Sequence, residues 1–554
     1  MDLRAAAVGI GIGAIVAATG CGGAATRTGE AARAERERLQ SHVGVLASDA
    51  LEGRMTGTAG YAAAADYVAG QFRAIGLEPA GTDGYFQAVP YAVANIDATR
   101  SHAWLHRGGR RRELAWKADW IAGADVLRER VKVKAAMVFV GYGVDAPELN
   151  YDDYAGLDVR GKIVVTMLGA PKLFPVNPRA HYTAPPVKEA MAAAHGAVGI
   201  VVLRDAHFAQ AAPWAAVANN AGRVPSMKWV AADGAAADYF ATLRGNIVLS
   251  EAAAAELFKG APKSHAEVMA ADAAGEALPR FALAGELEID RRGALSRLSS
   301  PNVAGVLRGA DPRLAAETLV FTAHLDHLGV GAPVDGDAIY NGMYDDAMGV
   351  AVMLEVARAL ASRPQRPRRS VLFLATGGEE RGLLGSDYFA HYPTVPISQL
   401  VAAINFDNPV FLFPLADVVA FGSEHSTLGA AAEAAARAEG VKLTPDPLPD
   451  EVRFIRSDQY SFVRQGVPAL FLTPGTASGD PAVDGTARVM EFRRAHYHKP
   501  SDDLSRPVDW NAAATFTRLS ARVGAEVADA EEPPRWQPGN FFGERFGRPR
   551  ATAR

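Results

Sequence analysis

Residues 370–386 read SVLFLATGGEERGLLGS, an apolar run followed by two glycines and a pair of glutamates. The apolar run has the length and composition of a buried strand, and the two glycines end it with a turn. Glu379 and Glu380 therefore follow the carboxyl end of a strand, which is where open α/β sheets place their ligand sites. Taken alone, two charges at this place also fit a solvated loop, so the choice between a loop and a ligand site depends on the other segments of the sequence.

From residue 301 onward, short apolar runs alternate with helix-forming segments. The apolar runs include ETLVFTAHLDH, SVLFLATGG, QLVAAINFDN and VPALFLTPG, and the helical segments include GVAVMLEVARALA and GAAAEAAARAEG. Strands that alternate with helices in this way indicate an α/β fold with a doubly wound, mostly parallel sheet and helices on both faces.

Two earlier regions have a different texture. Residues 62–81, AAAADYVAGQFRAIGLEPAG, predict an amphipathic helix with Val68, Phe72 and Ile75 on one face and Gly76 at its end. From about residue 120, strand-like runs such as AAMVFVGYGV and GKIVVTMLG are separated by turns and followed by a helix that leads into a strand, EAMAAAHGAVGIVVL. We therefore expect one domain in two parts, residues 37–119 and 286–530, a smaller β-rich α/β domain inserted at 120–285, and an extended tail at 531–554.

Length and composition narrow the class of protein. The 554 residues exceed the roughly 250–300 at which single cores stop growing, so more than one domain is expected. A formal net charge of -5 and a charged fraction of 21% give no electrostatic footprint for nucleic acid. The chain has one cysteine, so no disulfide forms within it, and the fold rests on its core or on metal.

The chain begins MDLRAAAVGIGIGAIVAATGCGG, a short apolar stretch followed by small residues and Cys21. The stretch is too short to span a bilayer and is typical of a signal peptide. AATGC resembles a bacterial lipoprotein signal, so we expect a signal peptide at 1–20, lipidation of Cys21 and a polar linker at 21–36. This predicts attachment by lipid alone on the periplasmic side of a bacterial membrane, the outer membrane being favoured, with plain secretion as the alternative.

Potential metal ligands follow several of the predicted strands, at one edge of the sheet. They are His324 and Asp326 after LVFTA, Asp345 and Asp346 in YNGMYDDAMGVA, Glu379 and Glu380 after SVLFLAT, Asp407 after VAAINF, and His498 in AHYHKPSDD. Carboxylates from four segments would repel one another there without a cation, and zinc binds this mixture of His and carboxylate at about 2.0–2.2 Å. The sequence therefore predicts a metal centre. His327, a lone histidine by this criterion, is predicted to be an ordinary surface or core residue.

The ordered motifs AHLDH, YNGMYDDAMG, GGEERGLLGS, NFDN, SDQYSFVRQGVPA and YHKPSDD resemble the co-catalytic zinc exopeptidases related to bacterial leucyl aminopeptidase. The resemblance covers roughly residues 285–525, and the segment that begins LASDALEGRMTG resembles the same family's amino-terminal part. The inserted region, with VFVGYGVDAPELNYDDYAGLDVRGKIVV, is similar to a protease-associated domain. The resemblance implies the zinc exopeptidase fold and two zinc ions.

The resemblance also implies a role for each motif residue. It makes Asp345 the bridging carboxylate, Glu380 and His498 the remaining ligands of one zinc, His324 and Asp407 those of the other, and Glu379 the general base. Asp326, placed with the catalytic residues, and Asp346 would orient ligands by hydrogen bonds, although a helix-capping role suits Asp346 equally well. The family further implies a cis peptide bond between Asp345 and Asp346. Tyr344, Met348 and Gln459 depart from the common pattern, which leaves the substrate preference open.

The function expected from these motifs is a zinc aminopeptidase acting on peptides. One alternative is a carboxypeptidase for acidic residues, which would need cations near the substrate carboxylate, and Arg453 and Arg456 are close in sequence. A glutaminyl cyclase-like enzyme uses one zinc, and the intact second ligand set argues against it. A non-catalytic, lipid-anchored binding protein, as among transferrin-receptor relatives, would have lost ligands that this sequence retains.

Overall fold

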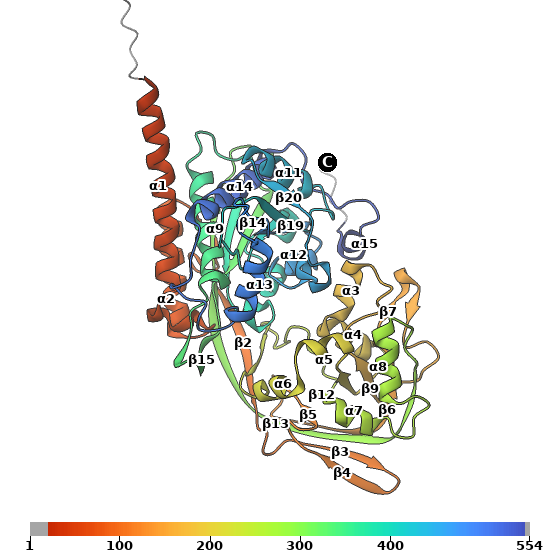
Figure 1. Cartoon of the computed structure of the whole chain (residues 1–554). Coiled ribbons are helices and arrows are strands. Elements are labelled where there is room, and N and C mark those ends of the chain that lie inside the picture. The colour runs from red at the N-terminus through yellow and green to blue at the C-terminus, as the bar shows by residue number, and fades with distance from the viewer. Residues whose placement is uncertain (1–19, 549–554) are drawn as a thin grey trace, which may run out of the picture.

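The chain folds into a larger and a smaller body that share one long strand, as the computed structural model of residues 20–548 shows (Figure 1). This strand is β13 (Phe281–Leu307). Its first part pairs with β6 (Arg130–Phe139) of the smaller body, and its second part pairs with β2 (Phe86–Ile96) and β17 (Ser370–Thr376) of the larger body. The two bodies are therefore joined by continuous backbone hydrogen bonding.

The larger body is built on a sheet whose centre is parallel. β17, β14, β18 and β21 lie side by side in that order and run the same way. At one flank β13 runs antiparallel to β17 and β2 antiparallel to β13, and at the other flank β19 runs antiparallel to β21. The other strands of this sheet are β1 (Glu78–Pro79), β11 (Ser226–Trp229), β14 (Thr318–His324), β18 (Leu400–Phe406), β19 (Asp417–Phe421), β20 (Lys442–Thr444) and β21 (Ala469–Pro474). The α/β fold with a mostly parallel sheet is confirmed.

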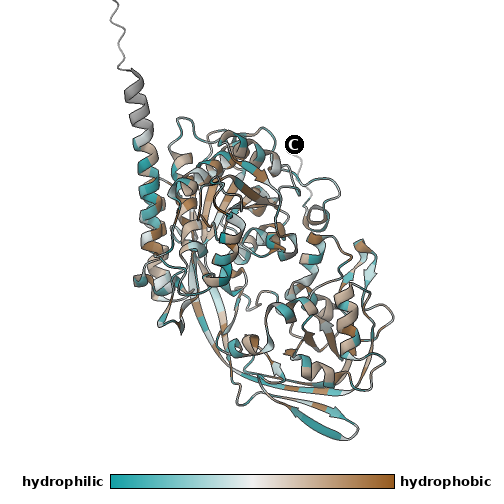
Figure 2. Ribbon diagram, viewed as in Figure 1, coloured by the Kyte–Doolittle hydropathy of each residue, from teal (hydrophilic) through white to brown (hydrophobic). Residues whose placement is uncertain are grey.

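β14, β17 and β18 are buried along their whole length and mostly apolar, because both faces of the sheet are covered (Figure 2). Phe321 stacks on Phe373, with ring centroids 5.5 Å apart, in the core on one face. Their neighbours Val320 and Leu372 point into a second core on the other face, with Phe389. The first face is covered by α1 (Gly20–Leu46), α2 (Ala59–Ile75), α9 (Met348–Ala361), α11 (Leu428–Ala438) and α14 (Trp510–Asp529). The second face is covered by α10 (Leu384–His391), α12 (Gln459–Val463) and α15 (Phe541–Phe546).

The register of the sheet brings the ends of three strands together. His324, the last residue of β14, lies opposite Thr376 at the end of β17, and Ala323 lies opposite Phe406 at the end of β18. Residues that directly follow these strands therefore meet at one edge.

α2 confirms the predicted amphipathic helix. Val68 and Phe72 are buried in the core, and Ile75 packs against it. Thr58 caps the start by accepting a hydrogen bond from the backbone of Tyr61. Gly76 ends the helix with a φ of 90°, a left-handed conformation that glycine adopts without steric cost.

The smaller body is a second α/β unit with its own apolar core. Its parallel strands β6, β9, β10 and β12 are flanked by antiparallel ones. Besides β13 and β6, the strands of its sheet are β3 (His102–Arg107), β4 (Arg110–Leu114), β5 (Trp120–Ile121), β9 (Ile163–Met167), β10 (Gly199–Leu203) and β12 (Asn246–Leu249), and a separate pair is formed by β7 (Asp145–Ala146) and β8 (Tyr151–Asp152). Its helices are α3 (Val176–Thr183), α4 (Pro185–Ala194), α5 (Ala206–Ala211), α6 (Trp214–Asn220), α7 (Glu251–Leu257) and α8 (His265–Ala274).

The limits of the smaller body differ from those expected at 120–285. β3 and β4 precede residue 120 but pair within the smaller body, and β11 follows residue 120 but pairs with β2 of the larger one. Alternating apolar and polar residues suit an edge strand in either sheet, so the sequence did not distinguish the partners of these segments.

The predicted linker at 21–36 is helical, which corrects the expectation of a flexible spacer. These residues belong to α1, whose sequence is rich in Ala, Arg and Glu, all strong helix formers. Farther along α1, Leu39 and Val43 are buried in the core, and Arg38 pairs with Glu355 of α9 at 2.7 Å. Cys21 lies in the first turn of this helix, and residues 1–19 of the predicted signal peptide lie outside the described residues.

The tail at 531–554 is not simply extended. It contains α15, and Phe542 is fully buried with its ring 5.4 Å from that of Phe454. Hydrophobic burial against the core thus outweighs the turn-forming composition of this segment. Among residues 20–548, no helix combines the length and the apolar character needed to cross a membrane.

Candidate metal centre

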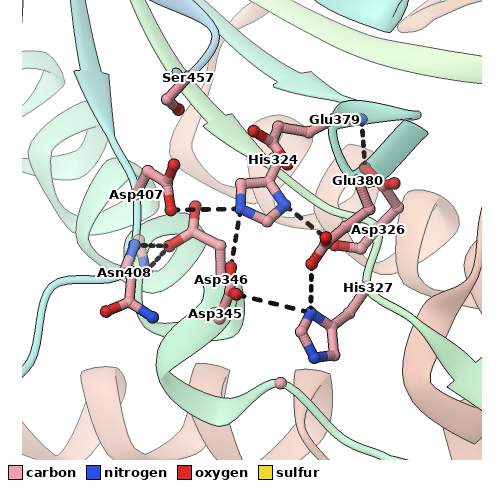
Figure 3. A network of polar contacts seen from close by, with 12 residues as sticks. His324, Asp326, His327, Asp345, Asp346, Glu379, Glu380, Asp407, Asn408 and Ser457 are labelled. Atoms are coloured by element: carbon pink, nitrogen blue, oxygen red, sulfur yellow. Dashed lines mark hydrogen bonds and ion pairs between the residues drawn. The ribbon is translucent and has the colours of Figure 1, made fainter. Parts of the chain in front are cut away.

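Five segments deliver the predicted ligands to the carboxyl edge of the sheet, and Figure 3 shows four of these ligands, His324, Asp345, Glu380 and Asp407. His324 is the last residue of β14, and Glu380 lies in the short helical turn η4 (Glu379–Arg381) that follows β17. Asp407 directly follows β18, and Asp345 lies in the turn η3 (Met343–Ala347) that leads into α9. His498 comes from the loop after α13 (Gly485–Ala495).

Asp345 lies between two histidines. Its Oδ1 is 3.1 Å from Nε2 of His324, and its Oδ2 is 3.0 Å from Nε2 of His498. His324 Nε2 is also 3.4 Å from Asp407 Oδ1, and His498 Nε2 is 3.4 Å from Glu380 Oε2. The two oxygens of one carboxylate therefore face two separate groups of potential ligands.

His327 belongs to this cluster, although the sequence analysis set it aside as an ordinary histidine. It is buried, and its Nδ1 is 2.7 Å from Glu380 Oε1 and 3.9 Å from Asp345 Oδ2. His327, Asp345 and Glu380 form one group able to hold a metal ion. The signal that could have identified it is its position three residues after His324, in the loop that leaves the same strand end.

Asp346 takes part in the other group. Its carboxylate lies with His324 and Asp407 in a second cluster able to hold a metal ion. Asp346 Oδ1 also accepts hydrogen bonds from the backbone N–H of Gly349, at 3.0 Å, and of Asn408, at 3.2 Å. It therefore contacts the first turn of α9 and ties that helix to the loop after β18, and its proposed role in orienting ligands stays a prediction.

The donor atoms fit a metal ion. Buried side-chain atoms that form no well-directed hydrogen bond within the described residues gather here, several of them in close ion pairs; they are His324 Nε2, both ring nitrogens of His327, Asp345 Oδ2, Asp346 Oδ2, Asp326 Oδ2 and Glu380 Oε1. Burying one such atom unsatisfied costs about 1–3 kcal/mol, so a concentration of them requires compensation. Imidazole and carboxylate together are the usual ligands of zinc.

The pKa values reflect this crowding of negative charge. Burial alone would lower the pKa of His324, but Glu379 and the carboxylates of Asp345 and Asp407 raise it well above its ordinary value. The pKa of His498 is likewise raised to about 9 against the effect of burial, chiefly by Asp345. Cations bound at the two groups would take the place of these protons, so metal binding here would release protons.

Asp326 organises two of the neighbouring residues. Its backbone carbonyl accepts a hydrogen bond from Nδ1 of His324 at 3.0 Å, and because a carbonyl only accepts, Nδ1 carries the hydrogen and Nε2 remains free to bind a metal. Its carboxylate accepts the backbone N–H of Glu379 at 3.1 Å. Burial raises the pKa of Asp326 to about 6.

Glu379 differs from its neighbour Glu380 in surroundings. Within the described residues, the structure shows no hydrogen bond or ion pair to the Glu379 carboxylate, whereas Glu380 faces two histidines. Burial raises the pKa of Glu379 well above its ordinary value, and the charges of Asp407 and Glu380 add to this. Figure 3 shows its side chain extending toward His324.

Two further residues hold the Asp345 loop, and the sequence analysis did not single them out. Asp502, fully buried, accepts the backbone N–H of Tyr344 at 3.0 Å and that of Asp345 at 3.2 Å. Arg54, also buried, donates hydrogen bonds to the backbone carbonyls of Asn341 and Gly342. Both stand in motifs already quoted, YHKPSDD and LEGRMTG, where their charge was the available signal. The peptide bond between Asp345 and Asp346 is cis, as the family resemblance implies.

Residues 302–524 match Peptidase family M28. This confirms the resemblance to the zinc exopeptidases, and every candidate ligand lies inside the M28 segment. The smaller body lies largely outside it, so its assignment as a protease-associated domain remains a prediction.

Individual relatives match over short stretches. Aminopeptidase NAALADL1 of Mus musculus is 31% identical over 136 residues, which is 24% of this chain and 16% of that protein. A probable zinc metalloprotease of Pyricularia oryzae is 38% identical over 104 residues, 18% of this chain and 20% of that protein. The chain thus spans about a fifth or less of the length of these relatives. Among solved structures, an aminopeptidase from Aneurinibacillus sp. strain AM-1 aligns with a TM-score of 0.49 and 19% identity, covering 90% of this chain and 95% of that one.

Proposed function

We propose that the chain is a zinc aminopeptidase that hydrolyses the first peptide bond of its substrates with two zinc ions. The observation that carries the proposal is the position of Asp345, whose two oxygens face separate ligand groups 3.1 and 3.0 Å away. A carboxylate so placed suits a bridge between two metals. The choice of aminopeptidase is supported by the name of the mouse relative and that of zinc by the name of the fungal one.

The residues that would hold the ions follow from the two groups. His324 and Asp407 would bind one zinc, Glu380 and His498 the other, and Asp345 both, with His327 beside the second ion. When bound, zinc supplies a Lewis acid that activates water and polarises the scissile carbonyl.

The chain's own residues supply the proton transfers. Glu379, whose carboxylate is free of partners among the described residues, would accept a proton from the attacking water and then deliver it to the leaving amine. The backbone hydrogen bond from Glu379 to Asp326 fixes where the carboxylate can reach. His324 needs no change of tautomer, because its Nδ1–H is already held by a carbonyl.

The alternatives have less support. A cyclase with one zinc would not need both ligand groups, and a non-catalytic binding protein would not need a complete set with a free glutamate beside it. A carboxypeptidase is the strongest alternative, because the cationic side chain of Arg453 would suit the carboxylate of a peptide's carboxyl terminus.

The test is a panel of aminoacyl p-nitroanilides combined with metal analysis of the same preparation. We expect turnover of at least one unblocked substrate, no turnover of its N-acetylated form, and two zinc ions per chain. Activity should be lost with a chelator and restored by zinc. Cleavage of the N-acetylated form only, or full activity without metal, would contradict the proposal.

We further propose that Cys21 anchors the enzyme to the periplasmic side of a bacterial membrane. The support is its place at the end of a short apolar leader, and multiple acylation gives stable attachment where one chain would not. The test is fractionation of wild type and Cys21→Ser. Equal amounts of both proteins in the soluble fraction would reject the anchor and favour plain secretion.

A further inference from the structure

A pocket opens beside the metal ligand Asp407. It begins at Asn408, the next residue along the chain, and has a volume of about 690 Å³ including its open mouth. Much of the lining is apolar and comes from β19, β21 and α13, with Val419, Phe421 and Val489 among the residues. Its comparable cavity volume is about 100 Å³, and a pocket that lies next to the ligands with apolar walls and a few polar groups is placed to hold one side chain of the substrate.

One cation in the lining, Arg453, forms no close ion pair with an acidic side chain that the structure describes. Among the described residues, its guanidinium forms no ion pair of 4.0 Å or less and no hydrogen bond, but lies 5.1 Å above the ring of Phe421 and 5.2 Å above that of Phe471. Arg493, which also lines the pocket, is paired with Glu451 at 2.9 Å. Arg453 therefore lacks the close ion pair that Arg493 has within the described part of the chain, although the charges of Asp407 and Glu451 act on it from farther away.

Arg453 keeps its charge in this position. Burial lowers its pKa to about 10, with a further contribution from Arg493, which still leaves the guanidinium protonated at neutral pH. A partly buried guanidinium that has lost water and gained no anion is unfavourable, and a ligand carboxylate would relieve it. The two aromatic rings hold its plane, and a held guanidinium presents its N–H donors as a fork that matches a carboxylate.

Asp446 is the acidic residue that lines the same pocket. Its Oδ1 accepts the backbone N–H of Leu448 at 2.8 Å, which engages it in its own loop. It forms no ion pair with Arg453 among the described residues. The two arginines thus outnumber the single acid in the lining, and the arginine without a partner is the one stacked on the aromatic rings.

We propose that this pocket receives the side chain of the substrate's amino-terminal residue and that Arg453 binds a carboxylate there, so that the enzyme prefers peptides beginning with Glu or Asp. This inference rests on the proposed function and gives it a substrate class. The same carboxylate chemistry could come from the carboxyl terminus of a peptide, and the experiment separates the two sources.

The first measurement compares kcat/KM for the p-nitroanilides of Glu, Gln, Leu and Lys, none of which has a free carboxyl terminus. Glu and Gln have nearly the same shape, so their ratio isolates the charge. A charge-assisted hydrogen bond predicts a preference for Glu of about 10- to 100-fold. In Arg453→Met, which keeps an apolar stem over the rings, the ratio should fall to about threefold or less.

Arg456→Met is the matched control. Arg456 is three residues away and exposed, and it does not line the pocket. Its variant should keep the wild-type ratio of Glu to Gln. The inference would be overturned by a wild-type ratio of Glu to Gln of one or less, by a preference for Lys, or by a ratio that is unchanged in Arg453→Met. In each case, turnover of the Leu substrate would leave the aminopeptidase proposal standing.

A second measurement does not depend on turnover. Free L-glutamate should raise the Tm of the zinc-loaded wild type more than L-glutamine does, and this difference should disappear in Arg453→Met. If glutamate binds in this way but no aminoacyl substrate is hydrolysed, the aminopeptidase proposal fails and the carboxylate site stands. Equal shifts by glutamate and glutamine would reject the carboxylate site.

A third measurement uses N-acetylated peptides that end in glutamate or in glutamine. We expect neither to be hydrolysed. Release of the carboxyl-terminal glutamate, lost in Arg453→Met, would overturn the assignment of the pocket to the first residue and favour a carboxypeptidase.

Discussion

Asp502→Asn should weaken metal binding although Asp502 is not itself a ligand. The carboxylate is fully buried, and its Oδ1 accepts the N–H of Tyr344 at 3.0 Å while its Oδ2 accepts the N–H of Asp345 at 3.2 Å. An asparagine of nearly the same shape offers one acceptor, and its NH₂ group would face a backbone donor. The loop that aims Asp345 at both ligand groups would then lose part of its support.

The magnitude follows from these contacts. Losing one charge-assisted hydrogen bond in a buried place costs about 1.5–3 kcal/mol. Partners that orient metal ligands typically change metal affinity by about 10- to 100-fold, equivalent to about 1.4–2.7 kcal/mol. The two ranges overlap, so we expect the zinc dissociation constant of Asp502→Asn to rise by about 10- to 100-fold.

The assay is zinc competition with a chromogenic chelator, supported by the stabilisation that excess zinc gives. That stabilisation should be smaller in Asp502→Asn by the same factor in affinity. Asp503→Asn is the control, because Asp503 accepts the N–H of Ser505 at 2.7 Å in an ordinary turn and, within residues 20–548, its side chain forms no hydrogen bond or ion pair with the Asp345 loop. Equal zinc affinity in wild type and Asp502→Asn would refute the reasoning.

Two other residues give separate predictions. His327→Ala should lower zinc affinity by about tenfold or more and leave less zinc bound after dialysis, because Nδ1 of His327 lies 2.7 Å from Glu380. The control, His207→Ala, changes an exposed histidine and should match wild type. Equal zinc retention in His327→Ala and wild type would show that His327 is no part of the centre. His181 of α3 contacts Tyr460 of α12 at 2.6 Å, and burial, followed by Arg545 and Arg464, lowers its pKa to about 3. Since the unfolded chain binds this proton near pH 6.5, the contribution of His181 to the free energy of unfolding is full above that pH and falls by about 2 kcal/mol between pH 6.5 and 5. Urea unfolding midpoints should show this fall in wild type, and a smaller fall in His181→Gln. Identical pH profiles for the two proteins would contradict the assignment.

The ligands that follow the strands could be predicted from the sequence, because parallel strands in register bring the residues after them to one edge of the sheet. Apolar runs locate β14, β17 and β18, parallel pairing aligns their ends, and the polar residues that follow must then meet. Asp345 and His498 lie in loops whose positions the strand register does not determine, and they were predicted from the family motifs.

What the sequence did not show depends on contacts between distant segments. His327 was missed because a histidine's role is set by its neighbours, here Glu380 and Asp345. Arg453 was noted only for its place in the chain, and in the part of the chain that the structure describes it forms no close ion pair like that of Arg493 with Glu451. α1 was expected to be a linker because its polar composition also suits a spacer, and its pairing with Glu355 lies more than 300 positions away.

The most direct test of the account is Glu379→Gln, analysed for zinc and for turnover in one preparation. The account predicts that the variant keeps the zinc content and zinc affinity of wild type, because Glu380 rather than Glu379 faces the histidines. It also predicts a fall in kcat of about 10²–10⁴, the usual effect of removing a general base. Turnover close to wild type, or loss of zinc together with activity, would contradict the separation of roles between the two glutamates.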